Sequence, residues 1–180
     1  TYDNVGAIMR AGAFRSNSLS ISGNAESTNF AITLNNYVEE GALQTNKGYN
    51  RNSIRMNLDH RFMDALSAGV SMYHARDGRD NIVGNPFTAA LQAPLDVDFS
   101  KKDENGRYLQ QPDPTVNVQN PLWTQQTRDD DQKSTRTLIG IQLSWSPLSW
   151  MTASGSVGYD RSDFERRIYV PKGTPNNIGT

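Results

Sequence analysis

The sequence has no cysteine and only two histidines among its 180 residues. Without cysteine the chain cannot form disulfide bonds, thiolate metal sites or a cysteine nucleophile. The histidines, His60 and His74, both fall on the outward, apolar faces of the strands predicted below, where we expect neither a metal site nor a catalytic role. No glycine–x–serine–x–glycine elbow, phosphate-binding loop or dinucleotide fingerprint occurs. The sequence therefore predicts that the protein is not an enzyme and, apart from the calcium ion considered below, has no cofactor.

A strong net charge and long apolar runs are also absent. The formal net charge is -1 at pH 7, which gives no support to nucleic acid as a partner. No run of about 18 apolar residues occurs, so a membrane-spanning helix is excluded. A membrane protein built of strands is still allowed, because a spanning strand needs only about 9–11 residues.

The clearest pattern that is present is an alternation of apolar and polar residues with a period of two. In residues 137–145, Ile139, Ile141, Leu143 and Trp145 fall on one face, and Gly140, Gln142 and Ser144 fall on the other. Successive side chains of a strand point to opposite faces of its sheet. This segment is therefore predicted to be a strand with one apolar and one mostly polar face.

The same alternation recurs in six segments and predicts an all-β, antiparallel fold. The predicted strands are residues 14–22, 28–38, 49–62, 66–75, 134–145 and 150–161. Their connections alternate between short and long, and the longest is a loop over residues 76–132. Short turns at one end and long loops at the other are typical of outer-membrane barrels. A loop of this length would be unusual in a compact soluble domain.

Two architectures explain such strands, a membrane barrel and a soluble β-sandwich. The polar faces carry charged residues, of which Arg55, Asp59 and Arg61 are predicted to face a water-filled lumen. Phe62, Trp145 and Trp150 lie beside short turns, as in the aromatic girdle at a membrane interface. An open six-stranded sheet cannot exist in lipid, because its edges would leave backbone groups without hydrogen bonds. We therefore expect an antiparallel transmembrane β-barrel segment that belongs to a larger barrel.

The loops contain three further candidates for binding. Tyr108 and Trp123, in the long loop, offer aromatic faces that suit sugar rings or a partner protein, although ordinary loop packing explains them equally well. The carboxylates of Asp129, Asp130 and Asp131 are hard oxygen ligands of the kind that calcium prefers. They lack the spacing of an EF-hand, so a solvated acidic loop is the preferred interpretation.

Several short runs resemble SusC/RagA-type TonB-dependent outer-membrane transporters, and they occur in the order and spacing of that family along the whole chain. They are Asn17-Ser18-Leu19-Ser20-Ile21-Ser22-Gly23, Thr28-Asn29-Phe30, Glu40-Gly41 ahead of residues 47–52, Ala93-Pro94-Leu95-Asp96, Asn120-Pro121-Leu122-Trp123, and Val157-Gly158-Tyr159-Asp160 together with Trp150.

This resemblance implies a barrel of about 22 strands with a plugged lumen. It also implies location in the bacterial outer membrane, a SusD-like surface lipoprotein as a lid, energy from TonB, and uptake of oligosaccharide or peptide. The sequence contains no recognisable plug domain or TonB box. We therefore expect residues 1–180 to be one internal segment of the barrel domain, surrounded by outer-membrane lipid.

Two alternatives stay open at this stage. The first is a soluble or surface-attached β-sandwich that binds glycan without transporting it. The second is a barrel with a purely structural or adhesive role.

Overall fold

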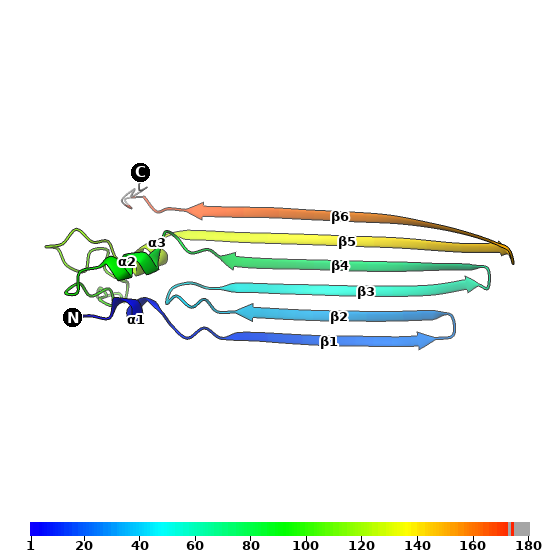
Figure 1. The fold of residues 1–180 in the computed structure, drawn as a ribbon, viewed down its shortest axis with the longest axis horizontal. Coiled ribbons are helices and arrows are strands. Elements are labelled where there is room, and N and C mark those ends of the chain that lie inside the picture. Colours follow the sequence, from blue (N-terminus) through cyan, green and yellow to red (C-terminus); the bar gives the residue numbers. More distant parts are fainter. Residues whose placement is uncertain (173, 175–180) are drawn as a thin grey trace.

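The computed structural model describes residues 1–172 and residue 174, which form a six-stranded antiparallel sheet with a small helical cap at one end (Figure 1). The strands lie in sequence order across the sheet. They are β1 (Phe14–Ala25), β2 (Thr28–Glu39), β3 (Tyr49–Met63), β4 (Leu66–Asp80), β5 (Asp129–Leu148) and β6 (Met151–Tyr169). The prediction of six antiparallel strands is confirmed.

The pairing register brings the apolar residues of all six strands onto one face of the sheet. One row across the sheet consists of Ile21, Ile32, Met56, Met72, Ile139 and Tyr159, each opposite the next. The next row contains Phe30, Leu58, Val70, Ile141 and Val157 in the same order. We call this side the apolar face and the opposite side the polar face. A shift of one residue in any pairing would break these rows, so the alternation fixes the register.

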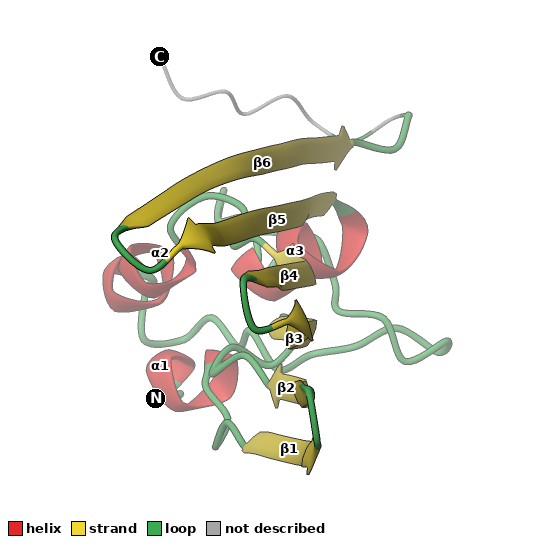
Figure 2. Ribbon diagram, turned by 90° about the vertical axis from the view of Figure 1, so that its right-hand side faces the viewer, coloured by secondary structure: helices red, strands yellow, loops and turns green. Residues whose placement is uncertain are grey.

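The apolar face has no second layer on it within the described residues. Leu58 is 43% exposed and Val70 39% exposed, although both lie in the middle of the sheet. Viewed along the strands, the sheet is a single layer, with the helices lying beyond its end (Figure 2). A β-sandwich buries such a face against another sheet. The sandwich interpretation therefore finds no support in this structure.

The connections sort by length to the two ends of the sheet. Residues 26–27, 64–65 and 149–150 form the short turns at one end, whereas residues 40–48 and 81–128 form the longer connections at the other (Figure 1). Gly48 has a φ of +82°, and a Cβ there would lie 2.0 Å from the carbonyl oxygen of Glu39. This close approach lets the 40–48 connection return tightly into β3.

Four strands extend well beyond the predicted ends. β1 continues to Ala25, β4 to Asp80 and β6 to Tyr169, and β5 begins at Asp129. The extensions of β5 and β6 contain charged residues, so hydrophobic alternation did not mark them. Backbone pairing between β5 and β6 continues there, and cross-strand ion pairs add to it, with Arg166 on Asp130 at 2.6 Å and Arg167 on Asp131 at 3.2 Å.

The predicted loop 76–132 is in fact residues 81–128, and it is not structureless. It contains helices α2 (Pro86–Gln92) and α3 (Pro121–Thr127), and a third short helix, α1 (Asn4–Ile8), precedes the first strand. Proline at the start of α2 and α3, after asparagine caps at Asn85 and Asn120, explains why these short helices begin there. We call residues 1–13, 40–48 and 81–128 the cap.

The cap has its own small hydrophobic core. The fully or nearly buried apolar side chains of that core are Ile8, Leu43, Ala90, Val97, Phe99 and Leu122, and none of them belongs to a strand. Because Ile8 and Leu43 come from the N-terminal segment and the 40–48 connection, the core joins three segments that are far apart in the sequence. The cap therefore packs as a unit at the end of the sheet with the long connections.

No helix in residues 1–172 has the length and apolar character needed to cross a membrane, a finding that does not bear on spanning strands.

Candidate functional site

The polar face carries a cluster of arginines and tyrosines near the cap. We call Tyr37, Tyr49, Arg51, Arg55, Tyr73 and Arg79 the arginine–tyrosine cluster. Its members come from β2, β3 and β4, and the alternation along each strand turns all of them to the polar face. The cluster exists because the register places Arg55 opposite Tyr73 and Tyr49 opposite Arg79.

Each arginine of the cluster contacts a tyrosine. The guanidinium of Arg55 lies 5.4 Å from the centre of the Tyr73 ring, and that of Arg79 lies 5.4 Å from the Tyr49 ring. Arg51 donates a hydrogen bond to the Tyr73 hydroxyl. Cation–π contacts of this kind hold the guanidinium groups in place without neutralising their charge.

Other arginines of the polar face are neutralised by carboxylates. Arg136 forms a two-bond ion pair with Asp160, at 3.2 and 2.8 Å, and Arg166 does the same with Asp130 at 2.7 and 2.6 Å. Within the described residues, no carboxylate pairs with Arg51, Arg55 or Arg79. The cluster is thus a place where positive charge and aromatic faces are available together.

These groups suit a particular class of ligand. Guanidinium groups bind carboxylates in a planar, two-bond geometry, and aromatic faces stack on amides, sugar rings and other aromatic groups. The hydroxyl of Tyr37 donates to the Glu39 carboxylate at 2.9 Å, so one carboxylate borders the cluster. No group of three metal-binding side chains occurs in the described part of the chain. The guanidinium and aromatic groups of the cluster can bind a ligand of this class.

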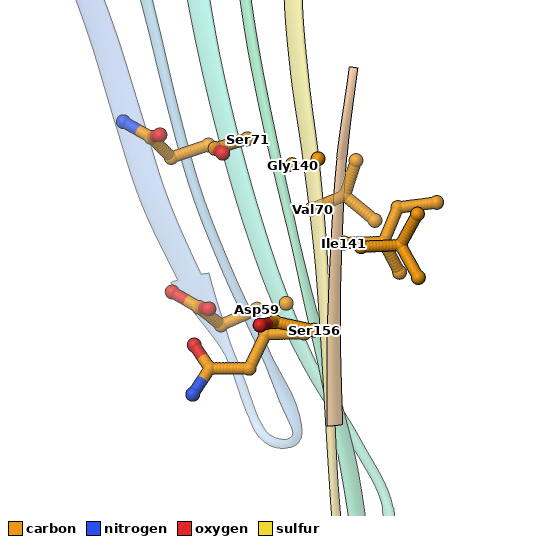
Figure 3. Close-up of a pocket in the computed structure, with 11 residues that line it drawn as sticks. Asp59, Val70, Ser71, Gly140, Ile141 and Ser156 are labelled. Atoms are coloured by element: carbon orange, nitrogen blue, oxygen red, sulfur yellow. The ribbon is translucent and has the colours of Figure 1, made fainter. Parts of the chain in front are cut away.

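A second feature of the polar face is a hollow of about 430 Å³ closer to the short turns. Its floor includes Gly69 and Gly140, where a side chain would collide with the Asp59 carboxylate at 2.8 Å and the Ser71 hydroxyl at 2.7 Å. Asp59 and Ser71 project to one side of the sheet, and Val70 and Ile141 project to the other (Figure 3). The absence of side chains at Gly69 and Gly140 therefore lets the Asp59 carboxylate and the Ser71 hydroxyl lie over the backbone of the neighbouring strand.

The three residues predicted to face a lumen all lie on the polar face, but they do not form one site. Arg55 belongs to the arginine–tyrosine cluster, whereas Asp59 lines the hollow. Arg61 lies still closer to the turns, where its backbone N–H donates to the Ser27 carbonyl at 2.7 Å. Whether this face lines a lumen stays a prediction.

The three predicted interface aromatics lie at the end of the sheet with the short turns. Phe62 and Trp145 are on the apolar face, and Trp150 is in the turn between β5 and β6. They are 59%, 49% and 79% exposed, so no described part of the chain covers them. Their contact with a membrane interface remains a prediction.

The two aromatic residues of the long connection lie in different environments. Tyr108 packs against the core of the cap, and the ammonium of Lys102 lies 4.6 Å from its ring centre. Trp123, on α3, lines a separate hollow with Arg107 and Lys172. The packing of Tyr108 gives it a structural role in the cap, and a ligand or partner at either residue stays a prediction.

The three aspartates considered for calcium are the first residues of β5 and do not form a loop. The alternation of the strand sends Asp130 to the face opposite to that of Asp129 and Asp131. Each carboxylate pairs with a cation, Asp129 with Lys47, Asp130 with Arg166 and Asp131 with Arg167. The acidic loop that we expected here is wrong, because these residues continue the β5–β6 pairing.

In the cap, the exposed Asp113 accepts hydrogen bonds from the hydroxyl and the backbone N–H of Thr115, at 2.6 and 2.8 Å. These bonds hold the pKa of its carboxyl below the ordinary value. The same two hydrogen bonds fix a turn of the cap.

Sequence reasoning did not single out Tyr37, Tyr49, Tyr73, Arg51 or Arg79. Their spacing already placed them on polar faces, so the signal was present in each strand separately. Their assembly into one cluster depends on the register between β2, β3 and β4, which only the structure supplies.

Comparison with solved structures found the same strand arrangement in chains of the RagAB peptide importer. Its "closed-closed" state matches with a TM-score of 0.66 and 16% identity, and its "open-open" state with 0.65 and 15%. Another structure of the RagAB peptide transporter also gives 0.65 and 15%. Each match covers 90% of this chain and 19% of the other, so the chain spans about a fifth of those proteins. No family model and no curated protein matched the sequence.

At this identity the comparison establishes the fold. The chain has the fold of part of a RagA-type barrel, as the resemblance in its sequence predicted.

Proposed function

We propose that this chain is a wall segment of an outer-membrane transporter of the SusC/RagA type, which takes up peptide or oligosaccharide. The observation that carries the proposal is the two-sided sheet. One face is apolar and uncovered within the described residues, and the other bears an arginine–tyrosine cluster whose arginines form no ion pair with a described residue. In a membrane barrel, the first face meets lipid and the second meets the lumen through which cargo passes.

The extent of the apolar face supports a membrane environment. On β4 its outward residues run from Leu66 to His74, which corresponds to about 27 Å of strand at about 3.4 Å per residue. With the strand tilt of about 40° that is usual in such barrels, this covers about 20 Å, close to the apolar band of about 25 Å. Further strands would pair with the open edges at β1 and β6 and close a barrel of about 22 strands in total.

Peptide is the cargo that the chemistry of the polar face favours. Peptides carry carboxylates for Arg51, Arg55 and Arg79, and amides and aromatic groups for the tyrosines, whereas neutral oligosaccharides would use mainly the aromatic faces. The solved structures with the same fold belong to a peptide importer, which agrees with this choice. A SusD-like lipoprotein would close over the cap, and TonB would act on a plug encoded outside these residues.

The test of membrane insertion uses the full-length protein. We expect that its extraction requires detergent and that it migrates differently on a gel before and after heating, as folded barrels do. A protein that folds in water without detergent would overturn the proposal.

The test of cargo binding uses the purified full-length protein and a fluorescent peptide library with free C-terminal carboxylates. The triple variant Arg51→Gln, Arg55→Gln, Arg79→Gln should bind these peptides about tenfold more weakly or worse, because three charged donors are lost. Arg136→Gln is the matched control, since Asp160 already neutralises that arginine, and it should bind within about twofold of the wild type. Equal binding by the triple variant, or uptake that never occurs in cells, would favour a structural or adhesive barrel.

A further inference from the structure

A ladder of asparagine side chains crosses the apolar face next to the cap. Asn17, Asn36 and Asn52 lie opposite one another on β1, β2 and β3. The amide of Asn17 donates to the oxygen of Asn36 at 3.3 Å, and the amide of Asn36 donates to the oxygen of Asn52 at 2.8 Å. This polar row directly follows the apolar row of Leu19, Leu34 and Ile54, so it marks the boundary of the apolar residues on the side toward the cap.

The ladder ends on donors that have no acceptor. The register places Asn52 opposite Arg76 on β4, and both side chains are exposed. Neither the amide nitrogen of Asn52 nor the guanidinium of Arg76 donates a hydrogen bond to another described residue. Both donors are therefore available to the acceptor groups of a ligand.

The carboxylates of this face near the donors already have partners. The apolar face of β1–β4 carries two cations near the ladder, Arg15 and Arg76, and one carboxylate, Asp80, at the end of β4. The row of Arg76 continues across Thr135 to Asp163 on β6, whose carboxylate forms an ion pair with Arg161 at 2.8 Å. The carboxylate of Asp80 accepts a hydrogen bond from the backbone of Lys47. Arg76 thus lies in a local field that attracts an anion.

These groups line a groove of about 600 Å³. Its lining includes the apolar row of Leu19, Leu34 and Ile54 and, on the side toward the cap, the polar row of the ladder and Arg76. An amphiphile that has an apolar tail and an anionic, hydroxyl-rich head matches this gradient, since the tail would lie on the leucines and the head on the amides and the guanidinium.

We propose that this groove binds the phosphorylated sugar headgroup of an acylated glycolipid of the surrounding membrane. The inference rests on the proposed function, because it requires lipid against the apolar face. Arg76 and the amide of Asn52 donate to the phosphate, and the remaining amide groups of the ladder bind sugar hydroxyls. The acyl chains follow the apolar face toward the short turns.

The experiment titrates the full-length protein, purified in dodecyl maltoside, with bisphosphorylated lipid A and follows bound lipid by native mass spectrometry. We expect Arg76→Gln to weaken binding about tenfold, which corresponds to about 1.4 kcal/mol, and Asn52→Ala to weaken it in the same direction. Lys133→Gln is the matched control, because Lys133 is a cation on the same face but outside the groove. It should bind within about twofold of the wild type.

Three results would overturn the inference. Equal weakening by Arg76→Gln and Lys133→Gln would indicate general charge attraction. Equal binding of dephosphorylated lipid A would show that the phosphate is not recognised, and displacement of the lipid by millimolar inorganic phosphate would indicate a site for the free anion. Failure of the proposed function is recognised separately, because such a protein would not need detergent. A detergent-requiring barrel that binds peptide but shows no groove-dependent lipid binding would refute this inference alone.

Discussion

Two asparagine side chains in the cap form hydrogen bonds with buried backbone groups that regular secondary structure would otherwise pair. Asn4 donates to the carbonyl of Val97 at 2.9 Å and accepts from the N–H of Phe99 at 3.2 Å. Asn120 donates to the carbonyl of Phe99 at 2.9 Å and accepts from the N–H of Leu122 at 3.0 Å. A buried backbone group without a partner is costly, so these amides allow an irregular segment to be buried.

The change Asn120→Ala tests this role. It removes both hydrogen bonds of a side chain that is 0% exposed and leaves a buried carbonyl and a buried N–H without partners. We expect the cap to lose about 1–3 kcal/mol of stability, with little effect on the sheet. Hydrogen exchange of the full-length protein in detergent should report faster exchange in residues 81–128 and unchanged exchange in β1–β6.

Asn105→Ala is the control, because Asn105 is an exposed residue of the same cap. It should leave exchange in the cap close to that of the wild type. Equal acceleration by both variants would show that the buried hydrogen bonds of Asn120 do not hold the cap together.

For individual residues of the candidate site, the sequence predicted only the face of the sheet on which each one lies. The alternation alone placed Arg55, Asp59 and Arg61 on the polar side of β3, and the structure has them there. It could not separate Arg55, which contacts Tyr73, from Asp59, which lies over Gly69. That difference depends on which residues of β4 lie opposite, and a single strand's pattern carries no information about its neighbour.

At the scale of elements, the strands were predictable where one face is apolar and the other is polar. Through the middle of β5, Ile139 and Ile141 alternate with polar residues, and the strand was found there. Toward Asp129 and in the last third of β6, both faces are polar and the alternation disappears. Pairing nevertheless continues, because backbone hydrogen bonds do not require apolar side chains and the ion pairs of Asp130 and Asp131 add to them.

Two neighbouring residues of β4 test the assignment of the faces. Val70 points to the apolar face and Ser71 to the polar face, beside the hollow (Figure 3). Val70→Arg would place a charge in lipid near the middle of the band, which costs about 2–4 kcal/mol in membrane barrels. Ser71→Arg would place the same charge in a polar, open space and should cost much less.

The measurement is denaturant unfolding of the full-length protein in lipid vesicles, with the heat-dependent gel shift as the readout. Since the two variants carry the same side chain at adjacent positions, each is the control of the other. Equal destabilisation, or a larger effect of Ser71→Arg, would contradict the assignment of the apolar face to lipid.

At the scale of the whole molecule, the sheet and the cap are held together by different interactions. The sheet is held together by backbone pairing. Among the buried apolar residues of the described chain, only Ala75 lies in a strand. The cap has a conventional core of six buried apolar residues. That core was not predictable, because Ile8, Leu43 and Phe99 come from three distant segments with no common periodicity.

This division predicts that the cap can be removed without loss of the sheet or of the proposed barrel. Asp80 and Asp131 are register partners, so the ends of β4 and β5 lie next to each other and a linker of about four Gly/Ser residues can join Ile82 to Arg128. Ile8 and Leu43 would lose their apolar neighbours in this deletion, so Ile8→Ser and Leu43→Ser are introduced at the same time. We expect detergent extraction and the heat-dependent gel shift to remain those of the wild type.

Peptide uptake by the same variant should fall about tenfold or more. The cap lies at the end of the sheet next to the arginine–tyrosine cluster, and in the proposed transporter it would contact the lid. The double variant Ile8→Ser, Leu43→Ser, with residues 83–127 retained, is the control that separates loss of the cap from damage to its core. If the shortened protein no longer assembles, the cap takes part in pairing the strands, and the separation of core and sheet is refuted. If it assembles and imports peptide at the normal rate, cargo enters without the cap, and the arginine–tyrosine cluster must capture it alone.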